Sequence, residues 1–290
     1  MKRWLLPLLI MTIILLFSAC SVPNTQPNIA ATTLPVYTFT TTLCSKTPIT
    51  VNRVVQENIS CLHDYTLTVK HMQILEQADY VVISGGGLED FLRDALPVNK
   101  AIIDASIGIE TKHHAEHHDS SGHHHDSDPH FWLSIASARQ MAHTICTELK
   151  KTYPQYTSQF EDNLIQLDAA FDKLEAYAKA QLETIRCRDL ITFHDGFSYM
   201  AEELGLTILL AVEEESGSEA SAKDLITICK LVSDYNVPAI FTEKNSSDSA
   251  ANVIARETGV KVFSLDMAIS GNDYFQAMYY NIDTLKEALG

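Results

Sequence analysis

The chain has little positive charge. It carries 21 Lys and Arg residues against 37 Asp and Glu, a formal net charge of -16 at pH 7. A nucleic-acid-binding surface needs a basic footprint, so this balance argues against nucleic acid as a partner and suits a soluble protein that attracts cations. Its 290 residues are enough for two domains of ordinary size, each with a core.

Several local motifs are also missing. The sequence contains no CxxC spacing, which excludes the compact zinc and redox motifs, and no HExxH, which weakens a zinc-hydrolase interpretation. Gly85-Gly86-Gly87 lacks both the Lys-Ser/Thr ending of a P-loop and the full GxGxxG pattern. These glycines therefore predict a sharp strand-to-helix turn in preference to a phosphate-binding loop.

No apolar run reaches the ~20 residues that a membrane span needs. Met-Lys-Arg, the apolar stretch Trp4–Phe17 and the small residues up to Cys20 together form an export signal. The end of this segment, Phe-Ser-Ala-Cys, resembles the bacterial lipoprotein box. That resemblance implies a signal peptide over 1–20, lipid modification of Cys20 and a flexible tether over 21–28.

An odd number of cysteines remains when Cys20 is set aside. In an exported protein, at least one thiol is then expected to be unpaired or paired with another molecule. The remaining cysteines are Cys44, Cys61, Cys146, Cys187 and Cys229. Cys44 with Cys61 and Cys187 with Cys229 are the nearest plausible pairs, and spacing establishes neither.

Strand and helix patterns alternate in both halves of the chain. Repeated βα units predict an α/β fold with parallel sheets flanked by helices. Strands are expected at 29–33, 49–55, 80–84, 101–104, 190–193, 207–212, 238–242 and 260–265. Helices are expected at 36–44, through Met72 to Ala78, and at 88–95, 134–151, 196–204, 221–235, 247–258 and 273–289.

A long amphipathic helix is predicted between the two halves. Apolar residues recur every three or four positions from Pro154 to Ile185. Such a helix could form a coiled-coil dimer or could brace two lobes of one chain. The resulting division is an N-terminal lobe over 29–153, a linking helix over 154–185 and a C-terminal lobe over 186–290.

The stretch 113–130 is the richest in metal-ligating side chains, with eight imidazoles and four carboxylates. Neutral imidazole is the commonest protein ligand for zinc-like metals, so metal contact is the first hypothesis for the surrounding loop, 112–128. The alternatives are a disordered charged surface loop or a purification tag, although a tag would sit at a terminus. Apart from His130, its histidines are His113, His114, His117, His118, His123, His124 and His125.

Four dispersed residues form a second candidate set. His194 and Asp266 each follow a predicted strand, where ligands of open α/β sheets bind, and His63 and His130 lie at loop-to-helix junctions. Three imidazoles and one carboxylate can fill a four-coordinate zinc shell. For each residue alone, a hydrogen-bonded structural side chain is the favoured alternative.

Nearly all of the mature chain resembles the zinc/manganese-type solute-binding lipoproteins of bacterial ABC importers. The resemblance rests on His63-Asp64-Tyr65, the His-rich insertion, Asp128-Pro129-His130-Phe131-Trp132-Leu133, the long helix, Phe193-His194-Asp195-Gly196-Phe197, and Gly259-Val260-Lys261-Val262 leading to Asp266. It implies two α/β lobes joined by a rigid helix, with metal held between them.

By this resemblance, His63, His130, His194 and Asp266 are the metal ligands. A His at the third position is typical of the zinc branch, whereas manganese relatives usually have Glu there. Glu243, in a segment familiar from the family, is interpreted as structural. The expected protein is a monomeric, lipid-anchored, non-enzymatic extracytoplasmic zinc receptor for a membrane permease. A manganese receptor, a zinc hydrolase and a metal-scavenging surface adhesin are the alternatives.

Overall fold

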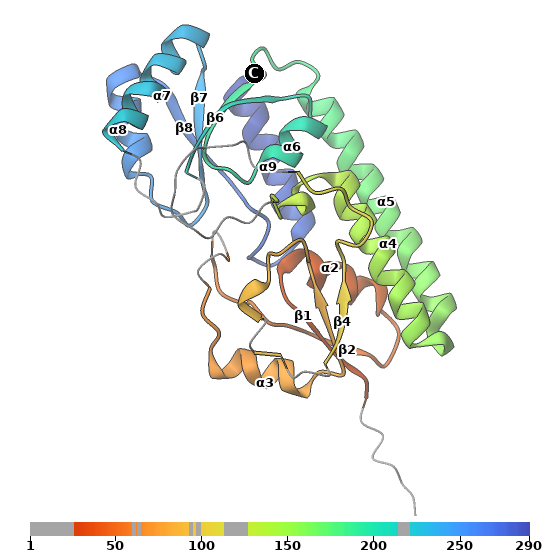
Figure 1. The fold of residues 1–290 in the computed structure, drawn as a ribbon. Helices are drawn as coiled ribbons and strands as arrows, with labels where there is room; N and C mark the ends of the chain where they lie inside the picture. Colours follow the sequence, from red (N-terminus) through yellow and green to blue (C-terminus); the bar gives the residue numbers. More distant parts are fainter. Residues whose placement is uncertain are drawn as a thin grey trace, which may run out of the picture.

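The protein folds into two α/β lobes that are bridged by long helices (Figure 1). The computed structural model describes residues 26–59, 62, 65–92, 95–96, 100–112, 127–213 and 221–290. Each lobe is built on one four-stranded sheet, with strand orders β2-β1-β3-β4 and β6-β5-β7-β8. All pairings within the two sheets are parallel, as βα alternation requires.

The strands follow the predicted β-rich runs to within one or two residues. Those of the N-terminal lobe are β1 Asn28–Ala31, β2 Thr50–Arg53, β3 Tyr80–Ile83 and β4 Ala101–Asp104. Those of the C-terminal lobe are β5 Asp189–His194, β6 Thr207–Glu213, β7 Ala239–Glu243 and β8 Lys261–Leu265. Because the strands within each sheet are parallel, their carboxyl ends meet along one edge.

The helices cover both sheets and the space between the lobes. They are α2 Leu34–Leu43, α3 Val69–Gln77, α4 Ile135–Thr152, α5 Thr157–Leu182, α6 Ser198–Glu203, α7 Ala222–Tyr235, α8 Ser249–Thr258 and α9 Tyr274–Leu289. Short 3-10 turns are η1 Asp90–Leu92, η2 Phe131–Leu133 and η3 Pro154–Tyr156. Ser221 caps α7 by a capping box with Asp224, as its sequence predicts.

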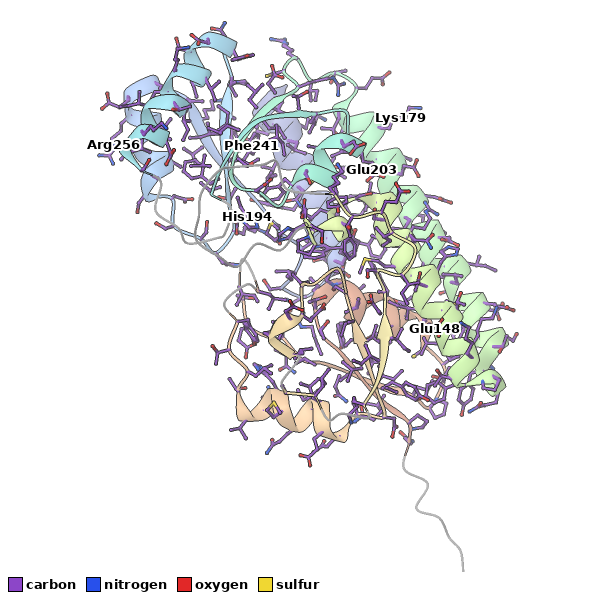
Figure 2. All side chains as sticks on the ribbon, in the orientation of Figure 1. Glu148, Lys179, His194, Glu203, Phe241 and Arg256 are labelled. Carbon is purple, nitrogen blue, oxygen red and sulfur yellow. The ribbon has the colours of Figure 1, made fainter. Side chains whose placement is uncertain are left out.

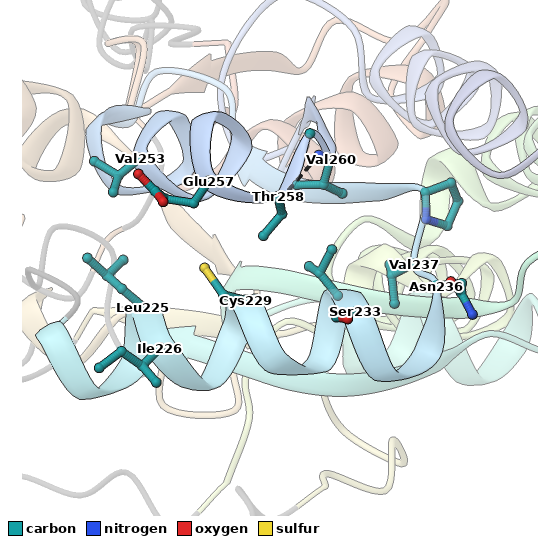
Figure 3. Close-up of a pocket in the computed structure, with 13 residues that line it drawn as sticks. Leu225, Ile226, Cys229, Ser233, Asn236, Val237, Val253, Glu257, Thr258 and Val260 are labelled. Carbon is teal, nitrogen blue, oxygen red and sulfur yellow. Dashed lines mark hydrogen bonds between the residues drawn. The ribbon is translucent and has the colours of Figure 1, made fainter.

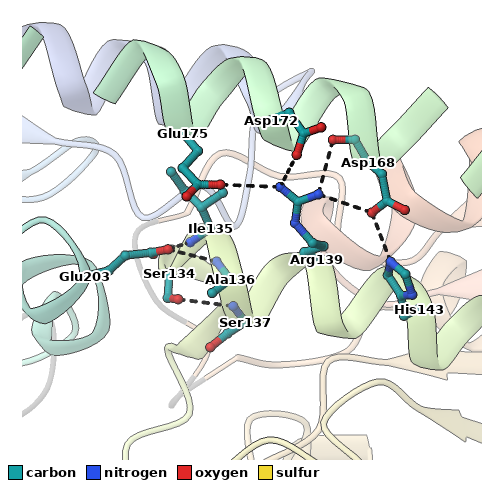
Figure 4. A network of polar contacts seen from close by, with 10 residues as sticks. All are labelled: Ser134, Ile135, Ala136, Ser137, Arg139, His143, Asp168, Asp172, Glu175 and Glu203. Carbon is teal, nitrogen blue, oxygen red and sulfur yellow. Dashed lines mark hydrogen bonds and ion pairs between the residues drawn. The ribbon is translucent and has the colours of Figure 1, made fainter. Parts of the chain in front are cut away.

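The long helix α5 runs along both lobes beside α4 (Figure 1). Its 26 residues give a rod of about 39 Å. Its apolar face packs against α2, α4 and α9 of the same chain, so α5 is an intramolecular brace and this face is not free for a coiled-coil partner. Arg139 of α4 ties the two helices together through Asp168, Asp172 and Glu175 of α5 (Figure 4).

One continuous apolar core passes between the lobes. Fully buried Trp132 of the N-terminal lobe donates its indole N–H to the carbonyl of Met267 at 2.7 Å. The hydroxyl of Tyr274 donates back to the carbonyl of Trp132 at 2.8 Å. Phe39 and Phe171 both pack edge-on near Tyr274. Buried side chains from both lobes therefore pack into one common core.

One local expectation is corrected. The helix predicted over 88–95 is not formed over its described residues, where η1 is the regular element. The preceding glycine turn is as predicted, because Gly85 and Gly86 adopt φ of +86° and +66°. The backbone N–H groups of Ser84 and Gly85 donate to the buried carboxyl of Glu89, and burial raises the pKa of that carboxyl to about 7. These amides therefore bind the protein's own side chain.

The described cysteines form no disulfide. Cys44, Cys146, Cys187 and Cys229 all carry free thiols, so the suggested Cys187–Cys229 pair is not formed, while Cys61, the suggested partner of Cys44, and Cys20 lie outside the described residues. Burial raises the pKa of the Cys44 thiol to about 12, an effect that the neighbouring Cys146 reinforces.

Within the described ranges, none of the helices has the length and apolar character to cross a membrane.

Candidate metal centre

His194 is the last residue of the central strand β5, at the carboxyl edge of the C-terminal sheet (Figure 2). Its ring is buried, and Nδ1 lies 3.5 Å from the Oε1 atom of Glu243, the last residue of the neighbouring strand β7. A carboxylate can only accept, so a neutral imidazole in this pair carries its proton on Nδ1. The unprotonated Nε2 is then the atom that can bind a metal ion.

His130 is held in the same way from the N-terminal lobe. It precedes η2, and both its backbone N–H and its Nδ1 lie within 2.9 Å of the Oδ1 atom of Asp128. Burial raises the pKa of Asp128, but hydrogen bonds from His130 and from Ser198 outweigh it, and the pKa lies below its ordinary value. An ionised Asp128 accepts a hydrogen bond from Nδ1–H of a neutral His130, whose Nε2 is then the nitrogen that can bind a metal ion.

The two Nε2 atoms point at each other from opposite lobes, 3.4 Å apart. Both residues are 1% exposed. Two nitrogens bound to one tetrahedral zinc at 2.0–2.1 Å are separated by about 3.3 Å, so the observed spacing matches a shared ion.

Gly196 is required for the position of the His194 ring. A Cβ on Gly196 would lie 2.6 Å from Cδ2 and 2.9 Å from Nε2 of His194, and 2.7 Å from Cε of Met267. These distances are shorter than carbon contacts allow, so a side chain at 196 must displace the ring.

We expect Gly196→Ala to weaken zinc binding by about 10- to 100-fold, comparable to the loss of a group that orients a ligand. The measurement is a competition titration with a chelator. Thr227→Ala is a suitable control, because that exposed hydroxyl on α7 bonds to the carbonyl of Lys223 in the same helix, at 2.9 Å. An unchanged zinc affinity for Gly196→Ala would contradict the placement of the ligand ring.

The other predicted ligands are placed differently. Asp266 follows β8 on the same sheet edge, with Oδ2 at 3.2 Å from Nζ of Lys244 and Oδ1 accepting the backbone N–H of Ala268. His63 lies outside the described residues, as do the seven histidines His113, His114, His117, His118, His123, His124 and His125. Among the residues that are described, no three His, Cys, Asp or Glu side chains converge on one point.

Two carboxylates beside the candidate ligands His130 and His194 are not identified from the sequence as part of the site. The sequence places Asp128 in the motif that contains His130 without indicating a role for it, and predicts a structural role for Glu243. Both are buried, at 2% and 3% exposure, and each lies against the Nδ1 atom of one histidine. The Asp-Pro-His spacing could have indicated the first contact, because residues two apart can meet around a turn; the second depends on the pairing of β5 with β7.

A separate cavity of about 910 Å³ lies between α7 and α8 on the C-terminal lobe (Figure 3). Leu225, Val253 and Val260 give it apolar walls, with Cys229 and Glu257 among its lining side chains. A metal ion needs more donors than this thiol and carboxylate provide. The cavity is therefore a poor metal site compared with the pair of histidines.

The fold and the paired histidines define a two-lobed α/β binding protein with donor side chains from both lobes. Residues 29–288 match the family described as zinc-uptake complex component A, periplasmic, and the chain belongs to that family.

Similar proteins support the assignment. A zinc-binding protein, AdcA, of Streptococcus pyogenes is 28% identical over 251 residues, which are 77% of this chain and 49% of the relative. The zinc-binding lipoprotein AdcA of Streptococcus pneumoniae is 28% identical over 281 residues, 90% of this chain and 55% of the relative. The chain thus spans about half the length of these curated relatives.

Solved structures share the whole fold. A crystal structure of ZnuA aligns with a TM-score of 0.81 at 25% identity, over 92% of this chain and 100% of the other. The laminin-binding protein Lmb of Streptococcus agalactiae aligns with a TM-score of 0.77 at 24% identity, over 91% of this chain and 100% of the other, which shows likeness of fold alone. The two-lobed α/β architecture predicted from the sequence is confirmed.

Proposed function

We propose that the protein is an extracytoplasmic receptor that captures Zn²⁺ between its lobes and delivers it to the permease of an ABC importer. The observation that carries the proposal is the pair of buried Nε2 atoms, 3.4 Å apart, each on a ring whose Nδ1 faces a carboxylate. Membership of a zinc-uptake family and zinc-binding relatives support the choice of cargo. Imidazole-rich sites suit zinc better than manganese, which favours carboxylate and water oxygen.

The proposed ligands are His63, His130, His194 and Asp266. His130 and His194 supply the two facing nitrogens, and His63 would add a third imidazole. Asp266 lies at the same sheet edge as His194. The next residue, Met267, and the His194 ring both lie close to Gly196. To bind the ion, the Asp266 carboxylate would exchange its contact with Lys244 for one with zinc.

The proposal extends to the remaining parts of the chain. Residues 1–20 act as a lipoprotein signal, Cys20 carries the lipid anchor, and 21–28 form the tether to the membrane. The lobes at 29–153 and 186–290, with the linking helix at 154–185, act as a monomer. The His-rich stretch collects zinc with lower affinity beside the main site. The role is transport and not catalysis, because the matching family and the similar proteins are zinc-uptake and zinc-binding proteins.

Calorimetry on the mature protein, with and without residues 113–125, tests this function. Lys112 stays in the deletion because its carbonyl accepts the backbone N–H of Asp128 at 2.7 Å. We expect one tight zinc equivalent in both proteins and the loss of weaker equivalents in the deletion. Protein purified without added metal should contain zinc on elemental analysis.

Loss of tight binding in the deletion would make the His-rich stretch the main site and refute the inter-lobe site. Zinc-dependent hydrolysis of ester or peptide substrates would favour an enzyme instead. A tight manganese equivalent with weak zinc binding would correct the cargo and keep the receptor.

A further inference from the structure

The short helix α6 belongs to the C-terminal lobe but makes its polar contacts with the N-terminal lobe. It begins four residues after His194 and packs against η2, which follows His130. Three of its side chains, Ser198, Tyr199 and Glu203, hydrogen-bond to backbone or side-chain atoms between 112 and 136. α6 is therefore placed to couple the two ligand-bearing segments.

Ser198 is the first link. Its hydroxyl donates to Oδ2 of Asp128 at 2.5 Å, while Oδ1 of the same carboxylate faces Nδ1 of His130 at 2.8 Å. Both oxygens of a buried carboxylate are thus occupied, one from each lobe. Since the carboxylate plane sets the direction of the N–H···O bond, Ser198 fixes how the His130 ring is turned.

Tyr199 is the second link. Its buried hydroxyl donates to the carbonyl of Asp128 at 2.9 Å and accepts the backbone N–H of Lys112 at 2.7 Å. Lys112 also forms an ion pair with Glu202 of α6, and its ammonium lies 4.9 Å from the centre of the Tyr199 ring. One phenol thereby holds both Lys112 and Asp128, which face each other in an antiparallel bridge.

Glu203 anchors the far end of α6. Its carboxylate accepts the backbone N–H groups of Ile135 and Ala136, at 2.5 and 3.0 Å, at the start of α4 (Figure 4). These amides have no partner within their own helix, and a negative charge at a helix N-terminus is favourable. α6 is consequently held at both ends by the N-terminal lobe.

We propose that α6 is a latch between the lobes, in which Ser198 and Tyr199 are positioning residues that aim His130 at His194. The inference rests on the proposed metal site. The bonds of α6 to the N-terminal lobe join protein atoms, so the orientation of the His130 ring depends on where α6 is held. Ser198 would not touch the ion itself and would act on it indirectly, through Asp128 and then His130.

The test compares Ser198→Ala, Ser198→Thr and Tyr199→Phe in the mature protein. We expect Ser198→Ala to lower zinc affinity by about 10- to 100-fold, the usual loss when an outer partner of a ligand is removed. Its Co²⁺ complex should show a changed visible absorption spectrum, because the ring nitrogen enters the coordination sphere at a different angle. Ser198→Thr keeps the hydroxyl and should restore both properties, and Tyr199→Phe should weaken binding while keeping the ring.

Thr147→Ala is the matched control, since that exposed hydroxyl bonds only within α4, to the carbonyl of His143. It should leave the affinity and the cobalt spectrum unchanged. If Ser198→Ala and Tyr199→Phe both bind zinc and cobalt like the parent protein, the proposed role of α6 is refuted, while the proposed metal site is not. If His130→Ala also binds zinc like the parent protein, the proposed metal site is refuted, and so is the role of α6 that rests on it.

Discussion

Replacing His194 by alanine is expected to lower zinc affinity by more than about 100-fold. Loss of an outer partner alone reduces affinity by about 10- to 100-fold, and His194 is proposed to donate a bond to the ion directly. The substitution would also leave the carboxylate of Glu243 buried beside an empty volume, with the ring nitrogen 3.5 Å away removed. The remaining ligands would then hold an incomplete shell.

Chelator competition measures the change, and His143→Ala is its control. That histidine is on α4, pairs with Asp168 at 2.9 Å and has a side chain that is 44% exposed, so its removal deletes an imidazole without touching the inter-lobe site. Full zinc affinity in His194→Ala would refute the assignment. An equal loss in both variants would point to a general effect of histidine number.

Trp132→Ala is expected to destabilise the fold by about 3–5 kcal/mol, the usual range for truncating a large buried aromatic side chain. Trp132 is fully buried, and its indole N–H is bonded to the carbonyl of Met267 in the other lobe. The substitution would open a cavity in the shared core and leave that carbonyl without the indole donor. It removes packing and an inter-lobe bond together.

Urea unfolding of the metal-free protein, followed by far-ultraviolet circular dichroism, gives the change in the free energy of unfolding. Ile165→Ala on α5 is the control, because that side chain is 68% exposed and should change stability by less than about 0.5 kcal/mol. A loss below about 1 kcal/mol for Trp132→Ala would mean that the lobes are not held together through this residue.

The shared core constrains how the proposed receptor can work. Trp132, Met267 and Tyr274 join the lobes directly behind the two histidines, and α6 joins them beside the site. A wide hinge motion would break buried hydrogen bonds and expose aromatic surface, at a cost of several kcal/mol. Exchange of the ion is therefore expected to involve smaller movements near the site.

Local patterns were sufficient for most of the fold. Short β-branched runs bounded by turn residues became strands, and the Ser134 and Ser221 caps begin the helices that they predict. The segment 88–95 was the exception. There, the buried carboxyl of Glu89 is held by the amides of the preceding glycine turn and by Thr32, a contact 57 residues away in sequence, and the described residues form only η1.

The sequence by itself determined the kinds of donor and the ends of the strands on which His194 and Asp266 stand, because ligand chemistry and strand periodicity are local. It could not determine which donors meet. Tertiary structure decided that His130 faces His194 at 3.4 Å, that Asp128 and Glu243 orient them, and that Asp266 pairs with Lys244. The contact of Asp128 with His130 is local in the sequence. The other contacts join residues that are far apart in the chain, and they depend on the pairing of parallel strands or on the docking of α6.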